Sequence, residues 1–94
     1  MTTERKKLRV LGYWTQYDHR WLISEVGERA EGRIWYDCDW QVAADDDPNE
    51  WGDLVQSPSL EVSKAAVEAK LKARGFVLIT DLVDAYLRSQ EATK

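Results

Sequence analysis

Residues 33–42 read Arg-Ile-Trp-Tyr-Asp-Cys-Asp-Trp-Gln-Val, and the side chains alternate between two sets. Such alternation predicts a half-buried β-strand, because successive side chains of a strand point to opposite faces of the sheet. The inner face would carry Ile34, Tyr36, Cys38, Trp40 and Val42. The outer face would carry Arg33, Trp35, Asp37, Asp39 and Gln41. We therefore expect an outer sheet face on which a tryptophan lies in line with two carboxylates.

Two segments before this stretch also have the composition of strands, at residues 8–16 and 21–26. Both are rich in apolar and aromatic side chains, and polar links at residues 17–20 and 27–32 separate the three segments. Short links between successive strands predict an antiparallel meander. Residues 1–7 are polar and charged without periodicity, so we expect a frayed tail before the first strand.

The segment after Val42 has the composition of an acidic surface loop. Residues 43–53 contain five carboxylates and no basic residue, and Pro48, Asn49 and Gly52 interrupt any regular element. The carboxylates belong to Asp45, Asp46, Asp47, Glu50 and Asp53. Trp51 lies near the end of this loop.

The spacing of apolar residues becomes helical after Ser57. Ser57 followed by Pro58 predicts a helix N-terminus, and Ser63 is a competing later cap. Gly75 is suited to the position just after the last helical turn, because glycine adopts positive φ angles without strain. Residues 76–79 are a short apolar run, which is either a fourth strand or a buried link.

A second helix is predicted to begin at Thr80 or Asp81. Two pairs of apolar residues at i, i+4 spacing would face the core, and residues 89–94 would form a polar tail. The pairs are Leu82 with Tyr86 and Val83 with Leu87.

This order of elements predicts an α+β fold. We expect a three-stranded antiparallel sheet, with residues 76–79 as a candidate short fourth strand, followed by two C-terminal helices packed on one face. A chain of 94 residues is long enough for one small domain, so we assign residues 1–94 to a single domain with tails at residues 1–7 and 89–94.

The charge and the cysteine content argue against some classes of function and indicate a cellular location. A net charge of −4 and an isoelectric point near 4.9 argue against a general affinity for nucleic acid or for an anionic membrane. Cys38 is the single cysteine, so no internal disulfide is expected, and the reducing cytoplasm is the expected location. No N-terminal signal segment and no run of about 18 apolar residues is present, so we expect a protein that is neither secreted nor membrane-spanning.

Candidate catalytic residues are few. His19 is the only histidine, and no serine or cysteine nucleophile lies near it in a recognisable signature. Asp37 and Asp39 are two residues apart on one predicted strand, whereas paired carboxylates of hydrolases approach the substrate from two sides. An enzyme centred on these three residues is therefore an alternative that requires a concave pocket, and a non-enzymatic protein is the expectation.

The sequence also matches no cofactor-binding or metal-binding motif. Counting the acidic loop as a calcium-binding loop from Asp45 places Glu50 at the required glycine and Gln56 at the required glutamate, so both defining positions mismatch. One cysteine excludes a zinc finger, and the dispersed glycines form no phosphate-binding loop. We expect neither a cofactor nor a metal ion.

The leading prediction is a small acidic protein-binding module, an adaptor or inhibitor of a larger protein. Aromatic residues surrounded by charge are typical anchors of protein interfaces. The predicted site comprises Trp35, Asp37, Asp39, Asp45, Asp46, Asp47, Glu50 and Trp51. Such a site suits a protein partner with a basic surface, and no membrane partner is expected. The alternative is a single-stranded nucleic-acid-binding domain that uses sheet aromatics together with Arg9, Arg20 and Arg33.

Overall fold

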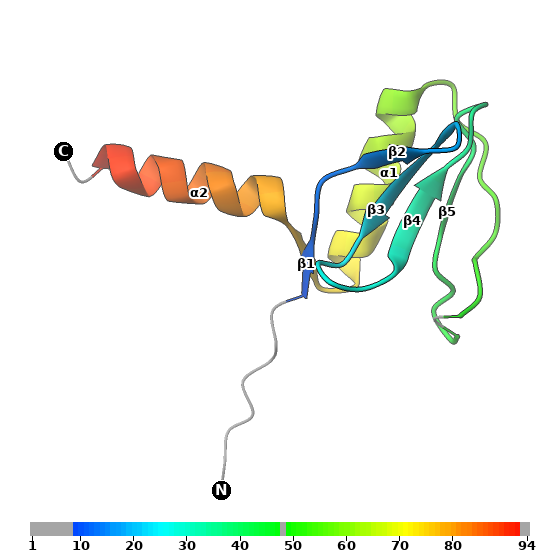
Figure 1. The fold of residues 1–94 in the computed structure, drawn as a ribbon, viewed down its shortest axis with the longest axis horizontal. Coiled ribbons are helices and arrows are strands. Elements are labelled where there is room, and N and C mark those ends of the chain that lie inside the picture. The colour runs from blue at the N-terminus through cyan, green and yellow to red at the C-terminus, as the bar shows by residue number, and fades with distance from the viewer. Residues whose placement is uncertain (1–8, 48, 93–94) are drawn as a thin grey trace, which may run out of the picture.

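Four antiparallel strands form the larger sheet, in the order β2-β3-β4-β5 (Figure 1). They are β2 (Thr15–Tyr17), β3 (Arg20–Ser24), β4 (Ala30–Ile34) and β5 (Trp40–Val42). The computed structural model describes residues 9–47 and 49–92, so the tail expected at residues 1–7 lies outside the described residues. Two helices follow the sheet along the chain, and the predicted α+β class is confirmed.

A second sheet of two strands pairs the first strand of the chain with the last. β1 (Arg9–Leu11) pairs in parallel with β6 (Phe76–Leu78), so the short apolar run after the first helix is a strand. β1 also meets the end of β3, where the backbone N–H of Gly12 donates to the carbonyl of Ser24 at 2.8 Å. The segment predicted as one strand at residues 8–16 is therefore two short strands, β1 and β2, each in a different sheet.

Residues 33–42 form a hairpin, so the prediction of one continuous strand was wrong. β4 and β5 pair with each other, and the N–H of Trp35 donates to the carbonyl of Asp39 at 2.8 Å across the turn between them. Cys38 in this turn has a φ of 75°, and Asp37 Oδ1 accepts the N–H of Asp39 at 3.2 Å. The two aspartates predicted for the outer strand face belong to the turn instead.

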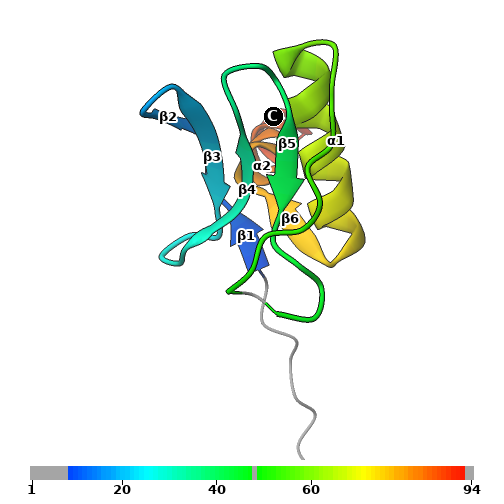
Figure 2. The same cartoon turned by 90° about the vertical axis from the view of Figure 1, so that its right-hand side faces the viewer.

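The first helix, α1 (Leu60–Ala73), packs on the inner face of the sheet (Figure 2). Its N-cap is Ser59, whose side-chain oxygen accepts a backbone N–H of the first turn at 3.2 Å. The predicted caps, Ser57 and Ser63, were wrong, and Ser63 is fully buried within the helix. Gly75 lies just beyond the helix with a φ of 99°, as predicted.

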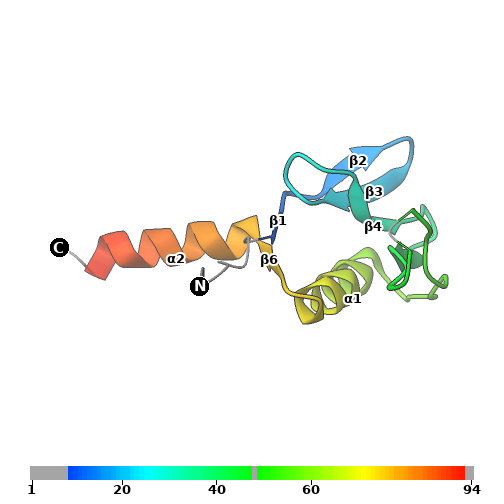
Figure 3. The same cartoon turned by 90° about the horizontal axis from the view of Figure 1, so that it is seen from below.

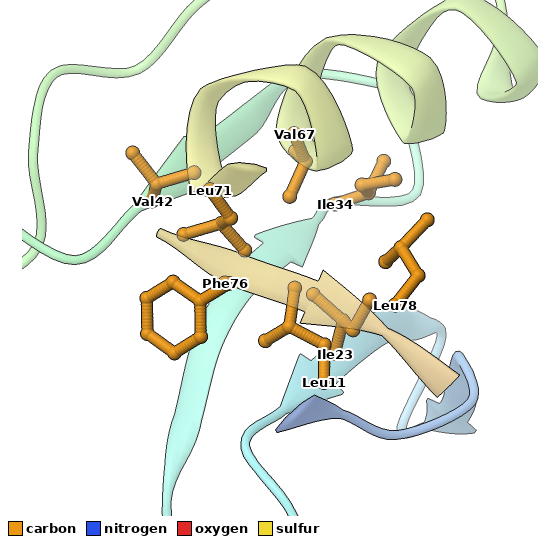
Figure 4. Packing of buried hydrophobic residues seen from close by; sticks show 8 residues of the cluster. All are labelled: Leu11, Ile23, Ile34, Val42, Val67, Leu71, Phe76 and Leu78. Atoms are coloured by element: carbon orange, nitrogen blue, oxygen red, sulfur yellow. The ribbon is translucent and has the colours of Figure 1, made fainter. Parts of the chain in front are cut away.

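The hydrophobic core lies between α1 and the strands. Figure 4 shows Val67 and Leu71 pointing from α1 toward the strands. Gly32 in β4 permits this close approach, because a Cβ there would lie 2.5 Å from Val67 Cγ1 and 3.0 Å from Ile23 Cγ2. Trp40 packs against the core at its edge, on the inner face where the sequence placed it. The core residues are Leu11, Ile23, Ile34, Val42, Val67, Leu71, Phe76 and Leu78.

The second helix, α2 (Ile79–Ala92), begins directly after β6 and points away from the rest of the domain (Figure 3). Each of residues 81–91 is exposed, so the expectation that both helices pack on one face of the sheet holds for α1 alone. The helix also continues through residues 89–92, where the sequence predicted a tail, and residues 93–94 lie outside the described residues. The four apolar residues of the predicted pairs therefore lie on a helix, but all four are exposed.

Candidate partner-binding site

The chain folds back along β5 immediately after leaving it. Trp40 and Val55 exchange two backbone hydrogen bonds of 2.9 Å, and the N–H of Gly52 donates to the carbonyl of Val42 at 2.8 Å. Residues 51–55 therefore cover the outer edge of β5 as an irregular strand, beside which they run in Figure 2. An edge strand covered in this way has its backbone groups satisfied, and Trp51 is held in a fixed position.

The acidic loop is closed by hydrogen bonds of its own. The N–H of Ala44 donates to the carbonyl of Glu50 at 2.9 Å, and the N–H of Glu50 donates to the carbonyl of Asp47 at 3.0 Å. Asp47 Oδ1 also accepts the N–H of Asn49 at 2.9 Å, and Asn49 Oδ1 accepts from Arg29. These contacts give the loop a defined shape, although it contains no regular element.

One of the loop carboxylates is paired with a base. Asp45 accepts from Arg74 of the α1 C-terminus at 2.7 Å, and its side chain remains 82% exposed. Within residues 9–47 and 49–92, no ion pair involves the four other carboxylates of this segment. They belong to Asp46, Asp47, Glu50 and Asp53. The loop therefore presents uncompensated negative charge.

A cleft of about 610 Å³ lies between this segment and the C-terminal part of α1. Its apolar lining includes Trp40, Trp51 and Val55, and its charged lining includes Asp46 and Lys70. The cleft thus combines two indole rings with carboxylates at one end of the domain. It is the place where the structure brings together the acidic loop and a tryptophan that the sequence singled out.

The outer face of the sheet is cationic and aromatic, and it carries Arg20 and Arg33, two of the three arginines that the sequence analysis named for the nucleic-acid-binding alternative. The guanidinium of Arg33 lies 4.8 Å from the ring centre of Trp35 and 4.1 Å from that of Trp51, and Arg20 lies 5.2 Å from Trp35. Gln41 Oε1 accepts from Arg33 Nε and from Trp35 Nε1, each at 3.0 Å. Arg33 contacts both rings, so this network fixes the position of Trp35 relative to Trp51.

Burial and charge affect the central guanidinium of this face. The pKa of Arg33 is lowered from its ordinary value, first by burial and second by the positive charge of Arg20. In the sequence, the alternation of residues 33–42 placed Arg33, Trp35 and Gln41 on one face, which was the available signal. It gave no indication that Trp51 would join them, because that contact depends on the return of the chain along β5.

The predicted site residues fall into three groups. Asp45, Asp46 and Trp51 line the cleft, with Asp47 and Glu50 in the same loop. Trp35 lies on the outer face, where Arg33 connects it to the cleft through Trp51. Asp37 and Asp39 lie in the turn at the opposite end of β5 and are not brought together with the acidic loop.

The candidate catalytic residue His19 lines a smaller pocket, whose lining does not include Asp37 or Asp39. His19 and Cys38, together with Trp21 and Trp35, surround a space of about 210 Å³. His19 is exposed in the turn between β2 and β3, where its φ is 63°. No hydrogen bond joins His19 to Cys38 in the part of the chain that the structure describes.

The described residues show neither a cluster of metal ligands nor a helix that could cross a membrane. In the described ranges, no three histidine, cysteine, aspartate or glutamate side chains are placed to hold a metal ion together. Neither α1 nor α2 has the length and hydropathy needed to cross a bilayer, and no other helix is present in those ranges. Comparison with models of protein families, with curated proteins and with solved structures gives no match to the chain.

Proposed function

We propose that this protein is a non-enzymatic protein-binding module, an adaptor or inhibitor, that docks its acidic cleft on a basic surface of a larger protein. The observation that carries the proposal is the set of carboxylates without ion pairs beside Trp51 and Trp40. Cys38 is free, which suits the reducing cytoplasm, and we include that location in the proposal.

The charges of the cleft support a basic partner. Carboxylates that form no ion pair within the protein attract Lys and Arg of an approaching protein and orient it before contact. Asp46, Asp47 and Glu50 lie within five residues of one another on a loop that its own hydrogen bonds hold in place. A loop ordered before binding loses little conformational entropy when the complex forms, so more of the contact energy contributes to affinity.

The tryptophans support a protein surface as the ligand. Trp51 lines the cleft, while its ring also stacks on the guanidinium of Arg33 and its backbone forms a β-bridge with Ala43, the residue after β5. A large rigid side chain that is already immobilised is the typical energetic centre of an interface, with charged residues around it. The cleft contains both kinds of residue, because Trp40 and Trp51 line it together with charged side chains. These charged residues are Asp45, Asp46, Asp53, Lys70 and Arg74.

The partner can be captured by site-specific photo-crosslinking in cells of the source organism. A benzophenone amino acid replaces Leu54, which is 53% exposed beside the cleft, or Tyr86, which is 62% exposed on α2 and serves as the control. We expect a discrete protein crosslinked from position 54 and not from position 86. Equal crosslinking from both positions would contradict the assignment of the cleft.

The role of the carboxylates is then measured with the purified partner. The triple variant Asp46→Asn, Asp47→Asn and Glu50→Gln should bind at least about tenfold more weakly, since it removes charges placed to meet a basic surface. A matched triple variant, Glu28→Gln, Asp84→Asn and Glu91→Gln, changes the net charge equally at other exposed positions and should bind within about twofold of the wild type. Equal losses in both variants would show that net charge, and not the cleft, determines binding.

A second candidate function is favoured by the outer face of the sheet. Arg33 has no carboxylate partner among the described residues and lies between Trp35 and Trp51, an arrangement typical of surfaces that bind single-stranded nucleic acid. Titration with a labelled oligothymidylate separates the two functions. Binding that weakens steeply with salt and is lost in Arg33→Ala would favour this candidate over the protein-binding proposal.

A further inference from the structure

A second cavity, of about 470 Å³, adjoins the acidic cleft. The two share Ala43, Ala44, Asp45 and Arg74 in their walls. The remaining lining residues of the second cavity are Arg9, Glu31 and Phe76. Phe76, Ala43 and Glu31 are 4%, 5% and 8% exposed and form its inner wall, whereas the exposed Arg9 and Asp45 mark its opening.

Both guanidinium groups in this cavity already have partners. Arg9 donates from Nη2 and Nε to the carboxylate of Glu25, at 3.0 and 3.4 Å, and its guanidinium lies 4.2 Å from the ring centre of Phe76. Arg74 donates to the carbonyl of Ala43 at 2.6 Å and pairs with Asp45 at 2.7 Å. Neither arginine is within ion-pair distance of Glu31.

Glu31 is the group that these contacts leave without a partner. It lies in β4 where the register with β3 shifts between Ile23 and Ser24, and it lines the cavity together with Arg9 and Phe76. Its backbone carbonyl accepts the N–H of Ala43, but no hydrogen bond or ion pair reaches its carboxylate from any described residue. The residue is 8% exposed, and its carboxylate oxygens keep access to the cavity, because no fully buried side-chain oxygen of the described residues lacks a hydrogen-bond partner. A carboxylate that is held mostly out of bulk water and has no ion-pair partner is stabilised by a cation placed beside it.

The local field is also negative. The pKa of the Arg9 guanidinium is raised, chiefly by its hydrogen bond to Glu25, and the charges of Glu25, Glu31 and Glu28 raise it further while burial opposes them. Near the cavity, three carboxylates face two arginines. The carboxylates are those of Glu25, which pairs with Arg9, Asp45, which pairs with Arg74, and Glu31. One negative charge therefore remains uncompensated, at the inner wall.

We propose that this cavity binds a primary ammonium group on an alkyl chain, with Glu31 as the carboxylate that receives it. An ammonium group is compact and carries three donors on a flexible stem, which suits a single carboxylate beside the apolar side chains of Phe76, Ala43 and Ala44. The alkyl chain would lie against Phe76, Ala43 and Ala44. Two guanidinium groups already line the cavity, so a third, broader cation fits less well.

The ammonium group has two sources, a lysine side chain of a partner protein or a free alkylamine. The lysine source rests on the proposed function, because a partner that docks in the acidic cleft would place its side chains at the wall that both cavities share. The site itself can be tested with the isolated protein, whatever the outcome for the cleft.

The first experiment titrates the protein with n-butylammonium chloride at constant ionic strength and follows the side-chain carboxyl carbons by NMR. We expect a saturable shift of the Glu31 resonance and at least about tenfold weaker binding in Glu31→Gln, measured at the backbone amides of Ala43 and Ala44. Glu28→Gln removes an exposed charge nearby and should bind within about twofold of the wild type. Amide spectra of both variants report whether the fold is retained.

Three results would overturn the proposal. They are the absence of saturable binding, unchanged binding in a folded Glu31→Gln variant, and tighter binding of n-butylguanidinium than of n-butylammonium. None of them affects the cleft, because the Asp46, Asp47 and Glu50 variant tests that surface separately. Conversely, retention of partner binding by that variant would overturn the cleft and leave ammonium binding at Glu31 in place.

The second experiment separates the two sources of the ammonium group. Glu31→Gln should weaken binding of the crosslinked partner at least about tenfold if a partner lysine occupies the cavity. Acetylation of the partner's lysines should then remove the difference between wild type and variant. Unchanged partner affinity together with butylammonium binding at Glu31 would assign the site to a free alkylamine.

Discussion

The two helices of this protein are equally long and differ in what they contact. α1 and α2 each comprise 14 residues, and each carries apolar side chains at helical spacing. α1 buries Ser63, Val67 and Leu71 against the sheet, whereas residues 81–91 of α2 are all exposed. An isolated helix of this length is marginal in water, so α1 is stabilised by packing while α2 has little besides its local interactions. Periodicity therefore predicts a helix, but a complementary surface decides whether the helix is packed.

The largest expected effect comes from truncating the buried leucine of α1, with an exposed leucine of α2 as the comparison. Leu71 is fully buried, and Leu71→Ala should lower the free energy of unfolding by about 2–5 kcal/mol, because the cavity left in a packed core cannot close. Leu87 is 53% exposed, and Leu87→Ala should change that free energy by no more than about 0.5 kcal/mol. Urea unfolding followed by tryptophan fluorescence measures both. Similar losses from the two variants would mean that α2 packs on the domain in solution.

A smaller effect is expected where α1 meets β4. Gly32→Ala would place a Cβ 2.5 Å from Val67 Cγ1, so the helix must shift, and we expect a loss of about 1–3 kcal/mol in the free energy of unfolding. Gly12 provides the matched control, because a Cβ there would meet its nearest atom, the carbonyl oxygen of Ser24, at 3.7 Å. Gly12→Ala should be close to neutral by the same urea measurement. A neutral Gly32→Ala would show that α1 packs less closely on the sheet.

Sequence reasoning succeeded with local signals. The order of sheet and helices, the end of α1 before Gly75 and the inward position of Trp40 each follow from spacing or from one residue type. It failed at residues 33–42, because the turn between β4 and β5 preserves the alternation of the flanking strands. Cys38 adopts a positive φ there, and no glycine or asparagine marks the turn.

The candidate site was predictable in part for the same reason. The acidic loop and Trp51 are adjacent in sequence, so their composition was visible. The network of Arg33 with two tryptophans and the burial of Glu31 depend on contacts between distant segments. Glu31 in particular lies in a charged stretch that predicted an exposed link, whereas it is buried in β4, at the shift in register with β3. The alternation of residues 33–42 indicates only that Arg33 and Trp35 share a face, and the local sequence indicates neither the contact with Trp51 nor the burial of Glu31.

The smallest effect is expected from removing the second helix altogether. A chain that ends after Ile79 retains α1 and all six strands, and it loses the ion pair between the two helices, that of Lys72 with Asp81 at 3.2 Å. Both of these side chains are about half exposed, and such pairs contribute about 0–1 kcal/mol. The free energy of unfolding should therefore change by less than about 1 kcal/mol.

In the intact chain, the amides of α2 should exchange with solvent far faster than those of α1, because opening an unpacked helix needs no global unfolding. Strong protection of α2 from exchange would show that its apolar face packs against another surface, and so would a loss of unfolding free energy well above about 1 kcal/mol on truncation. The contrast between the two helices would then no longer hold.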